Sequence, residues 1–255
     1  MPKIAIAQIL VETGRPDANL DRAMVALSQA AAKQADAVVL PECMDVGWLA
    51  DDPQGRGRTV PGPYSEHLSL AARELGILVV AGLTERRRGA VHNSAVLFEG
   101  SGHIQGIHRK INVFAKYHLG LDHYVPGQSL TVYDTPIGKV GMTICSDSFE
   151  ESHWITDALG SMGARVILSP CAWAIPPDAD IAAPEHNASW KGWYSALAQR
   201  NGLWILAANS IGVLAEGVWK DHPVYGGSLA VSPAGEVVAE GPRGQEAVLV
   251  VDCPL

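Results

Sequence analysis

Positive charge is scarce in this chain of 255 residues. Lys and Arg number 19 against 27 Asp and Glu, so the formal net charge is −8 at pH 7. A partner such as nucleic acid or an anionic membrane surface requires a basic face that neutralises phosphates. The dense basic run Arg86-Arg87-Arg88 is followed by Gly89 and lies between two strand-like stretches, which is typical of a solvated hairpin loop. We therefore expect no nucleic-acid partner and no membrane partner.

Long apolar runs are also missing. No stretch approaches the ~18 consecutive apolar residues that a membrane-spanning helix needs. Residues 4–10 alternate as in a strand, and the acidic Glu12 follows shortly after them. This pattern is unlike a secretory signal peptide. These absences favour a cytoplasmic protein.

Closely spaced cysteines are missing as well. The chain has four widely separated cysteines with no C-x-x-C pair, namely Cys43, Cys145, Cys171 and Cys253. This spacing is typical of reduced thiols rather than of a disulfide framework or a zinc site. One of the four thiols is therefore a candidate nucleophile, and local sequence has to indicate which.

Strand-like and helix-like patterns alternate along the whole chain. Apolar residues at every third or fourth position between 20 and 31 follow one helical face, for which Asn19 is the expected N-cap. The run at 37–40 is apolar throughout, as in a strand that is covered on both faces. We find no linker, repeat or shift in composition, and expect one α/β domain over residues 1–255. The other predicted helices are 65–76, 152–162 and 189–200; the other predicted strands are 4–9, 77–83, 93–98, 104–110, 130–134, 139–144, 166–168, 203–208, 228–231 and 247–251.

Three reactive side chains stand at the ends of predicted strands. Glu42 follows the apolar run that ends in Pro41, Lys110 ends a second strand pattern, and Cys145 ends a third. In open α/β sheets, groups just past the carboxyl ends of strands face the crevice where ligands bind. An ordinary loop position would explain any one of them alone. Together they predict one pocket that contains an acid, a base and a thiol.

The chemistry of this set is acyl transfer from nitrogen to sulfur to water. A free thiol has a pKa near ~8.5 and needs a base or a nearby cation to react at neutral pH. A carboxylate can accept its proton, pass it to a leaving nitrogen and later activate water against the thioester. A lysine ammonium would lower the pKa of the thiol and stabilise the tetrahedral oxyanion. No metal and no organic cofactor is implied.

Sequence motifs surround these residues in a fixed order. They are Leu-Pro-Glu at 40–42 with Gly-Trp at 47–48, His-Arg-Lys-Ile-Asn at 108–112, Ile-Cys-Ser-Asp at 144–147, and Ser-Pro-Cys-Ala-Trp at 169–173. From about residue 3 to residue 252 the chain resembles the nitrilase superfamily, the carbon–nitrogen hydrolases with a Glu-Lys-Cys triad. The resemblance implies an α-β-β-α sandwich that forms a homodimer or a higher homo-oligomer. It also implies that Glu42 is the general base, Lys110 the oxyanion-side cation and Cys145 the nucleophile.

The same resemblance suggests residues that bind substrate. The backbone N–H of Ser146 would be a second oxyanion donor, and Trp48 and Trp173 would shape the acyl site, although either Trp fits a core or interface position equally well. Many members carry a second glutamate six residues before the Pro-Gly that follows the lysine motif. Gly120 stands there in this chain, and Asp122 is a possible substitute.

The leading hypothesis is a hydrolase of a small linear amide or carbamoyl compound that forms a cysteine thioester and releases ammonia or an amine. A nitrilase that converts a nitrile to an acid and ammonia is the alternative within the class. True nitrilases usually have tryptophan after the nucleophile, where this chain has Ser146. A non-catalytic binding module of the same fold is a further alternative. A Cys-His hydrolase that uses one of the nine histidines as base would require that His, rather than Glu42, to be essential.

Overall fold

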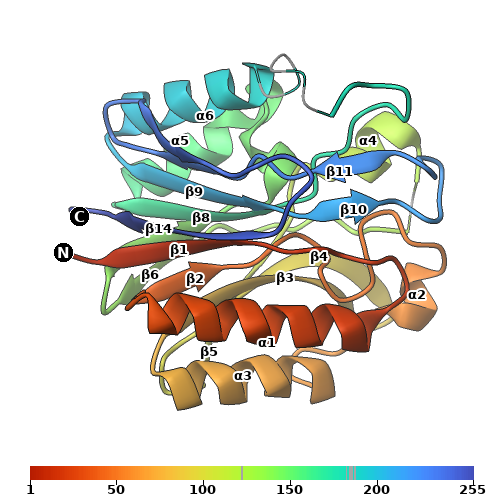
Figure 1. Ribbon diagram of the computed structural model, residues 1–255, viewed down its shortest axis with the longest axis horizontal. Helices are drawn as coiled ribbons and strands as arrows, with labels where there is room; N and C mark the ends of the chain where they lie inside the picture. The colour runs from red at the N-terminus through yellow and green to blue at the C-terminus, as the bar shows by residue number, and fades with distance from the viewer. Residues whose placement is uncertain (122, 182, 184–185, 187) are drawn as a thin grey trace.

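Two six-stranded sheets stack face to face, and helices cover their outer faces (Figure 1). The structure is a computed structural model that describes residues 1–121, 123–181, 183, 186 and 188–255. Helices α1 (Pro16–Ala32) and α3 (Pro63–Leu75) lie against the first sheet. Helices α5 (His153–Ser161) and α6 (Ala188–Asn201) lie against the second. The predicted α-β-β-α sandwich is confirmed.

The first sheet has the strand order β14-β1-β2-β3-β4-β5. Its central strands β1, β2 and β3 run parallel, while β14, β4 and β5 join through antiparallel pairs. The bounds are β1 (Lys3–Gln8), β2 (Ala37–Val39), β3 (Leu78–Arg87), β4 (Ala90–Phe98), β5 (Ile104–Arg109) and β14 (Ala247–Asp252).

The second sheet has the order β13-β12-β9-β8-β7-β6, with β7, β8 and β9 parallel. Its bounds are β6 (Val132–Thr135), β7 (Gly138–Met142), β8 (Val166–Cys171), β9 (Trp204–Asn209), β12 (Leu229–Val231) and β13 (Val237–Glu240). A separate hairpin pairs β10 (Ile211–Val213) with β11 (Pro223–Tyr225). Shorter elements are α2 (Pro53–Arg56), α4 (Phe114–Leu119) and the 3-10 turns η1 (Cys145–Ser148) and η2 (Glu150–Ser152).

The alternation in β1 shows how the sequence forms the layers. Ile4 and Ile6 point into the core between the two sheets, whereas Ala5 and Ala7 point into the core beneath the helices. Successive side chains of a strand point to opposite faces, so one strand supplies both cores. Full burial of one such isoleucine contributes roughly 1.5–3 kcal/mol.

The predicted N-cap of the first helix is wrong. The helix begins at Pro16, because proline has its φ preset for the first helical turn and needs no N–H partner there. Asn19 lies inside the helix and is buried. Its side-chain oxygen accepts from the N–H of Glu12 at 2.9 Å and its amide donates to the Glu12 carbonyl at 2.9 Å, which fixes the chain that enters the helix.

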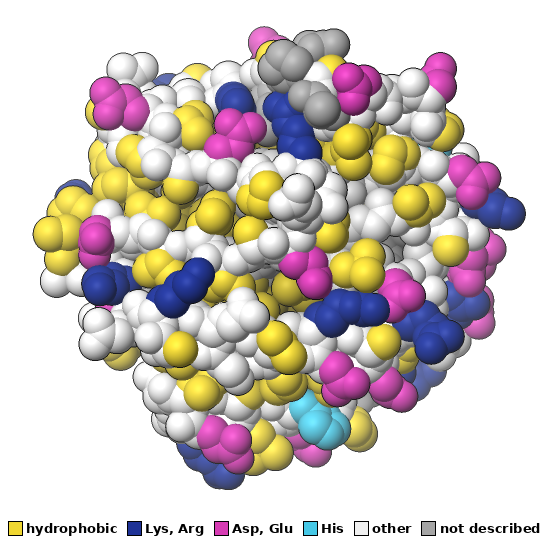
Figure 2. Space-filling model, in the orientation of Figure 1, with side chains coloured by type: hydrophobic (Ala, Val, Ile, Leu, Met, Phe, Trp, Pro, Cys, Tyr) yellow, Lys and Arg dark blue, Asp and Glu magenta, His cyan; other side chains and the backbone are white. Residues whose placement is uncertain are grey.

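The basic run spans the exposed end of a strand and a hairpin turn, whereas the sequence analysis expects a loop over all three arginines. Strand β3 extends through Arg87, and Arg88 and Gly89 form the turn to β4 with φ of +50° and +81°. Acidic and basic side chains are interspersed on the face of the molecule that Figure 2 shows, without a large patch of one sign. In the described residues, no helix is long and apolar enough to cross a membrane.

Candidate active site

Glu42, Lys110 and Cys145 lie together at one edge of the sandwich. Glu42 follows β2 and Lys110 follows β5 in the first sheet, while Cys145 follows β7 in the second. These strand ends meet although 68 residues separate Glu42 from Lys110. The three side chains belong to residues with exposed fractions of 1%, 2% and 7%. The structure therefore brings the predicted acid, base and thiol together, with the thiol residue the most accessible of them.

One oxygen of the Glu42 carboxylate accepts two hydrogen bonds. Lys110 Nζ donates to Glu42 Oε1 at 2.6 Å, and Asn93 Nδ2, from β4, donates to the same oxygen at 2.6 Å. Among the residues that the structure describes, none hydrogen-bonds the buried Oε2 atom. Burial opposes the charge on Lys110, but the neighbouring Glu42 carboxylate and Cys145 outweigh it and raise the lysine pKa. The pair is a buried ammonium–carboxylate pair with one free carboxylate oxygen.

A glycine on the neighbouring strand makes room for this acid. A Cβ atom at Gly82 would lie 2.4 Å from the Pro41 carbonyl oxygen and 2.5 Å from the Cα of Glu42. Both contacts are with backbone atoms, which cannot rotate away. A side chain at position 82 would therefore displace the segment that carries Glu42.

The chain turns sharply at Cys145. Its φ of +43° lies in the left-handed region, which costs a non-glycine residue roughly 1–2 kcal/mol. The turn joins the end of β7 to η1. Such strained strand-to-helix turns expose a nucleophile at the top of a sheet.

Asp147 fastens this turn to the segment that carries Lys110. Its Oδ1 accepts the N–H groups of Ile111 at 3.0 Å and Asn112 at 2.8 Å. Its Oδ2 accepts the N–H of Ile144 at 3.0 Å and contacts Nε2 of His108 at 2.8 Å. Burial opposes ionisation of Asp147, but the hydrogen bond and charge of His108 prevail and lower the pKa of this carboxyl. The lysine segment and the thiol turn are thus held by one ionised carboxylate.

The thiol of Cys145 is not held as a thiolate. A hydrogen bond with Cys171, followed by burial and the charge of Glu42, raises the pKa of Cys145 well above its ordinary value. Lys110 lowers this pKa, as the sequence predicts, but its effect is smaller than the opposing ones. The predicted effect of Lys110 therefore has the expected sign, but it does not offset the causes that raise the pKa of Cys145.

A cavity of about 130 Å³ opens beside the thiol. Cys145, Lys110 and the predicted residues Ser146, Trp48 and Trp173 all line it. Lining residues that the sequence analysis did not select are Phe114, Phe149, Ala172, Ala174 and Trp219. Ala172 and Ala174 flank the predicted Trp173, whereas Phe114, at the start of α4, and Trp219, between β10 and β11, come from distant segments that no local sequence pattern connects.

Ser146 and Asp122 are also among the predicted substrate-binding residues. The Ser146 hydroxyl donates to the Asn112 carbonyl at 2.6 Å, so the side chain braces the turn and only its backbone N–H remains a candidate oxyanion donor. Asp122 lies outside the described residues.

The other cysteines are enclosed. Cys43, Cys171 and Cys253 each have an exposed fraction of 0%, as expected for thiols that pack as small hydrophobic residues. Cys171 contacts the hydroxyl of Tyr194 at 3.4 Å. All four cysteines are free thiols.

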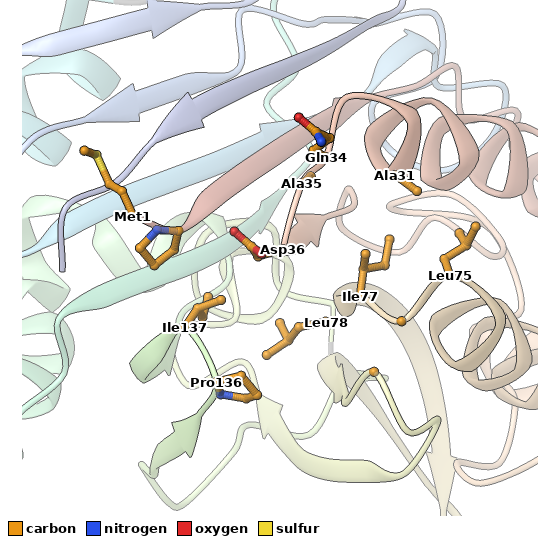
Figure 3. A pocket seen from close by; sticks show the side chains of 13 residues that line it. Met1, Ala31, Gln34, Ala35, Asp36, Leu75, Ile77, Leu78, Pro136 and Ile137 are labelled. Atoms are coloured by element: carbon orange, nitrogen blue, oxygen red, sulfur yellow. The ribbon is translucent and has the colours of Figure 1, made fainter.

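A larger hollow of about 690 Å³ lies at the opposite ends of the strands (Figure 3). Asp36, before β2, and Pro136 and Ile137, before β7, point toward it. No cysteine or lysine is among the described residues that line it, so it lacks the groups for acyl transfer. Within the described part of the chain, no group of three or more His, Cys, Asp or Glu residues could hold a metal ion.

Known proteins resemble this chain in sequence and in fold. Omega-amidase NIT2-A of Xenopus laevis is 30% identical over 261 residues, covering 99% of this chain and 88% of that protein. The crystal structure of Nit3 of Saccharomyces cerevisiae, a member of branch 10 of the nitrilase superfamily, has a TM-score of 0.82 at 23% identity and covers 98% of this chain and 89% of its own. An amidase from Nesterenkonia sp. has a TM-score of 0.83 at 24% identity, with coverage of 99% and 90%.

The family model described as carbon-nitrogen hydrolase matches residues 3–255, nearly the span over which the motifs resemble the nitrilase superfamily. That resemblance and the predicted class of enzyme are confirmed. The chain belongs to the carbon–nitrogen hydrolase family.

Proposed function

We propose that this enzyme hydrolyses small linear amides or carbamoyl compounds, with Cys145 as nucleophile, Glu42 as general base and Lys110 as the oxyanion-side cation. One observation carries the proposal. The buried Lys110–Glu42 pair, joined at 2.6 Å, lies beside the one cysteine of the four with a measurable exposed fraction. A module without catalytic activity has no physical need for a buried acid and lysine beside a thiol.

The first half-reaction begins with proton transfer from the thiol. Since the pKa of Cys145 is raised, its sulfur carries a proton until Glu42 accepts it. The free Oε2 of Glu42 has an acceptor site for that proton, because Lys110 and Asn93 both bind Oε1. Sulfur attacks the carbonyl carbon, and the oxyanion is stabilised by Lys110 and the N–H of Ser146. Glu42 then returns the proton to the leaving nitrogen as the carbon–nitrogen bond breaks, which leaves a thioester and releases ammonia or an amine.

The second half-reaction uses the same groups in reverse. Glu42 removes a proton from water, the resulting hydroxide attacks the thioester carbonyl, and the oxyanion occupies the same site. Collapse releases the carboxylic acid and restores the thiol with the proton held by Glu42. Glu42 thus carries the transferred proton in both half-reactions.

Two relatives support the choice of an amide. The Xenopus laevis protein is an omega-amidase, and the structural neighbour from Nesterenkonia sp. is an amidase. A nitrile would instead form a thioimidate with charge on nitrogen. The oxyanion site formed by Lys110 and Ser146 matches a carbonyl oxygen better.

The test is kcat/KM for pairs that share one acyl group, such as butyramide and butyronitrile. We expect the amide to be favoured at least tenfold, which corresponds to about 1.4 kcal/mol in transition-state binding. A tenfold preference for the nitrile across several pairs would make the enzyme a nitrilase. Absence of ammonia release from amides, carbamoyl compounds and nitriles alike would favour the non-catalytic module.

We also propose a single domain over residues 1–255, a cytoplasmic location and a homodimer or higher homo-oligomer. Four free thiols suit a reducing compartment. Trp154 and Met162, in and just after α5, are 53% and 48% exposed, and they form apolar surface that a second copy would cover. Light scattering coupled to size exclusion measures the mass in solution, and a monomer at micromolar concentration would exclude a stable dimer.

A further inference from the structure

A continuous series of aromatic rings forms the wall of the cavity beside Cys145. Trp48 meets Trp219 edge-on with 5.5 Å between ring centroids, and Trp219 meets Phe114 at 5.5 Å. Phe114 contacts Phe149 at 6.0 Å, and Phe149 contacts Trp173 at 5.3 Å. All four distances fall within the ~4.5–7 Å of favourable aromatic pairs. We call these five residues the aromatic wall.

Helix α6 supports one side of the aromatic wall. Trp173 stacks on the fully buried Trp190 at 5.8 Å with an interplanar angle of 13°, and Phe149 lies 4.8 Å from Trp193. Both supporting residues belong to α6. Contacts with α6 therefore hold Trp173 and Phe149 in place on this side of the wall.

Positive charge in the cavity is already neutralised. Among the described residues that line it, Lys110 is the one cation, and its ammonium is bound to Glu42 at 2.6 Å. The positions outside the description, 122, 182, 184, 185 and 187, are Asp, Ala, Pro, Glu and Asn, none of which is a cation at neutral pH. A substrate carboxylate in this cavity would find no unpaired arginine or lysine among the lining residues.

Negative charge lies just outside the aromatic wall. Glu150 and Glu151 directly follow Phe149 and are both exposed. Glu151 lies 3.5 Å from His118, which stacks on Phe114 of the wall at 4.6 Å. This places acidic side chains on the side of the cavity that Phe114 and Phe149 form.

We infer that the cavity selects amides with a small, uncharged, apolar acyl group and rejects acyl chains that end in a second carboxylate. This inference rests on the proposed amide hydrolysis. An ionised carboxylate is unfavourable in an apolar site without a partner, whereas a branched alkyl group of the same shape contacts the aromatic wall. The volume of about 130 Å³ also lies below the ~300 Å³ at which pockets for drug-sized ligands begin. The acyl group is therefore short.

The test uses pairs of amides with the same shape and different charge. In 3-methylbutanamide an isopropyl group replaces the carboxylate of malonamate, and in 4-methylpentanamide it replaces that of succinamate. At pH 7.5 we expect kcat/KM to favour the neutral member of each pair at least 100-fold. Equal rates, or a preference for malonamate or succinamate, would overturn the inference.

A binding measurement separates this inference from the proposed reaction. Calorimetry with the Cys145→Ala variant measures whether 3-methylbutanamide or malonamate binds without turnover. If the wild-type enzyme hydrolyses none of the four amides, the proposed reaction fails. The pocket inference still stands if the neutral amide alone binds the variant, and falls if malonamate binds better or neither amide binds.

Substitution of the aromatic wall gives a second test. Trp219→Ala should enlarge the cavity and raise the ratio of kcat/KM for 4-methylpentanamide over 3-methylbutanamide about tenfold. Trp219→Phe keeps a ring and should shift the ratio in the same direction by less, which provides a folded variant if the alanine protein is unstable. Leu70→Ala on α3, 44% exposed and absent from the described cavity lining, is the control. An unchanged ratio in both Trp219 variants would contradict a role in acyl selection.

Discussion

Two cysteines adopt nearly the same backbone conformation at corresponding places in the two sheets. Cys43 follows β2 with φ of +45°, and Cys145 follows β7 with φ of +43°. Burial raises the pKa of Cys43, and the Cys171 hydrogen bond together with burial raises that of Cys145. Neither a strained backbone nor a lowered pKa therefore distinguishes them.

Access makes the difference, since Glu42 and Lys110 act on the pKa of both thiols. Cys43 has an exposed fraction of 0% and packs in a core with Tyr124 and Val91. Cys145 is 7% exposed and shares its cavity with Lys110. The comparison teaches that a nucleophile here is a thiol that a substrate can reach, next to a base that can accept its proton.

Removal of each thiol gives the largest expected contrast. Cys145→Ala should reduce kcat at least 10⁴-fold, since no other step replaces thioester formation. Cys43→Ala should retain kcat within about threefold, because that thiol lies outside the described cavity lining. Steady-state ammonia release measures both, with circular dichroism as the folding control. Activity lost in Cys43→Ala and kept in Cys145→Ala would reverse the assignment.

The two buried acids near β2 give the next contrast. Glu42→Gln should lower kcat about 10³-fold, within the range for loss of a general base. Asp45→Asn should keep at least a fifth of wild-type kcat, because both Asp45 oxygens accept the Thr84 N–H, at 3.0 and 3.1 Å, and serve the fold. Turnover near wild type in Glu42→Gln would refute its role as base.

Asp147 tests how the turn around Cys145 is held. Asp147→Asn should lower the free energy of unfolding at pH 7 by about 2 kcal/mol, the range for hydrogen bonds to a charged group. The folded-state pKa of Asp147 is lowered, so its stabilisation is present above the unfolded pKa of ~3.9 and is lost as the pH falls below it. Urea unfolding measures the free energy of unfolding of both proteins at pH 7 and at pH 3. We expect the difference between wild type and variant to be smaller at pH 3. A gap that widens in acid would contradict this sign.

Alkylation gives the smallest contrast. Brief iodoacetamide treatment at neutral pH should label Cys145 before the three enclosed thiols, and its rate should still rise above pH 9 because its pKa is raised. Cys171→Ala should increase the rate a few-fold by removing the largest cause of that shift. Cys253→Ala, a buried cysteine after β14, should leave the rate unchanged. Labelling of Cys43 before Cys145 would contradict the comparison.

The sequence was sufficient to predict the residues at strand ends. Short apolar runs mark strands reliably, and an acid after Leu40-Pro41 or a thiol after Ile144 stands out because nothing in a core requires it. The sandwich and its alternating layers follow from the same periodicity. The motif around 144–147 also pointed to Asp147, although its four contacts required the structure.

The remaining features depend on contacts between distant segments. Trp219 reaches the cavity from the loop between β10 and β11, and Asn93 reaches Glu42 from β4 across 51 residues. Helix α4 has six residues, too few for a clear hydrophobic period, so the sequence predicts no helix there. Strand β13 is mostly exposed, so it lacks the apolar alternation that reveals a strand.

The Asp147 attachment makes the reaction sensitive to how the two sheets are stacked. Glu42 and Lys110 follow strands of the first sheet, and Cys145 follows a strand of the second. The distance between the Cys145 thiol and the Glu42 carboxylate therefore depends on how the two sheets are aligned. A slide by one residue along a strand, about 3.3 Å, would exceed the length of a hydrogen bond. Mild denaturant or heat that loosens the layers should therefore abolish turnover while the secondary structure persists. Under the proposed mechanism, turnover should therefore depend on the register between the two sheets.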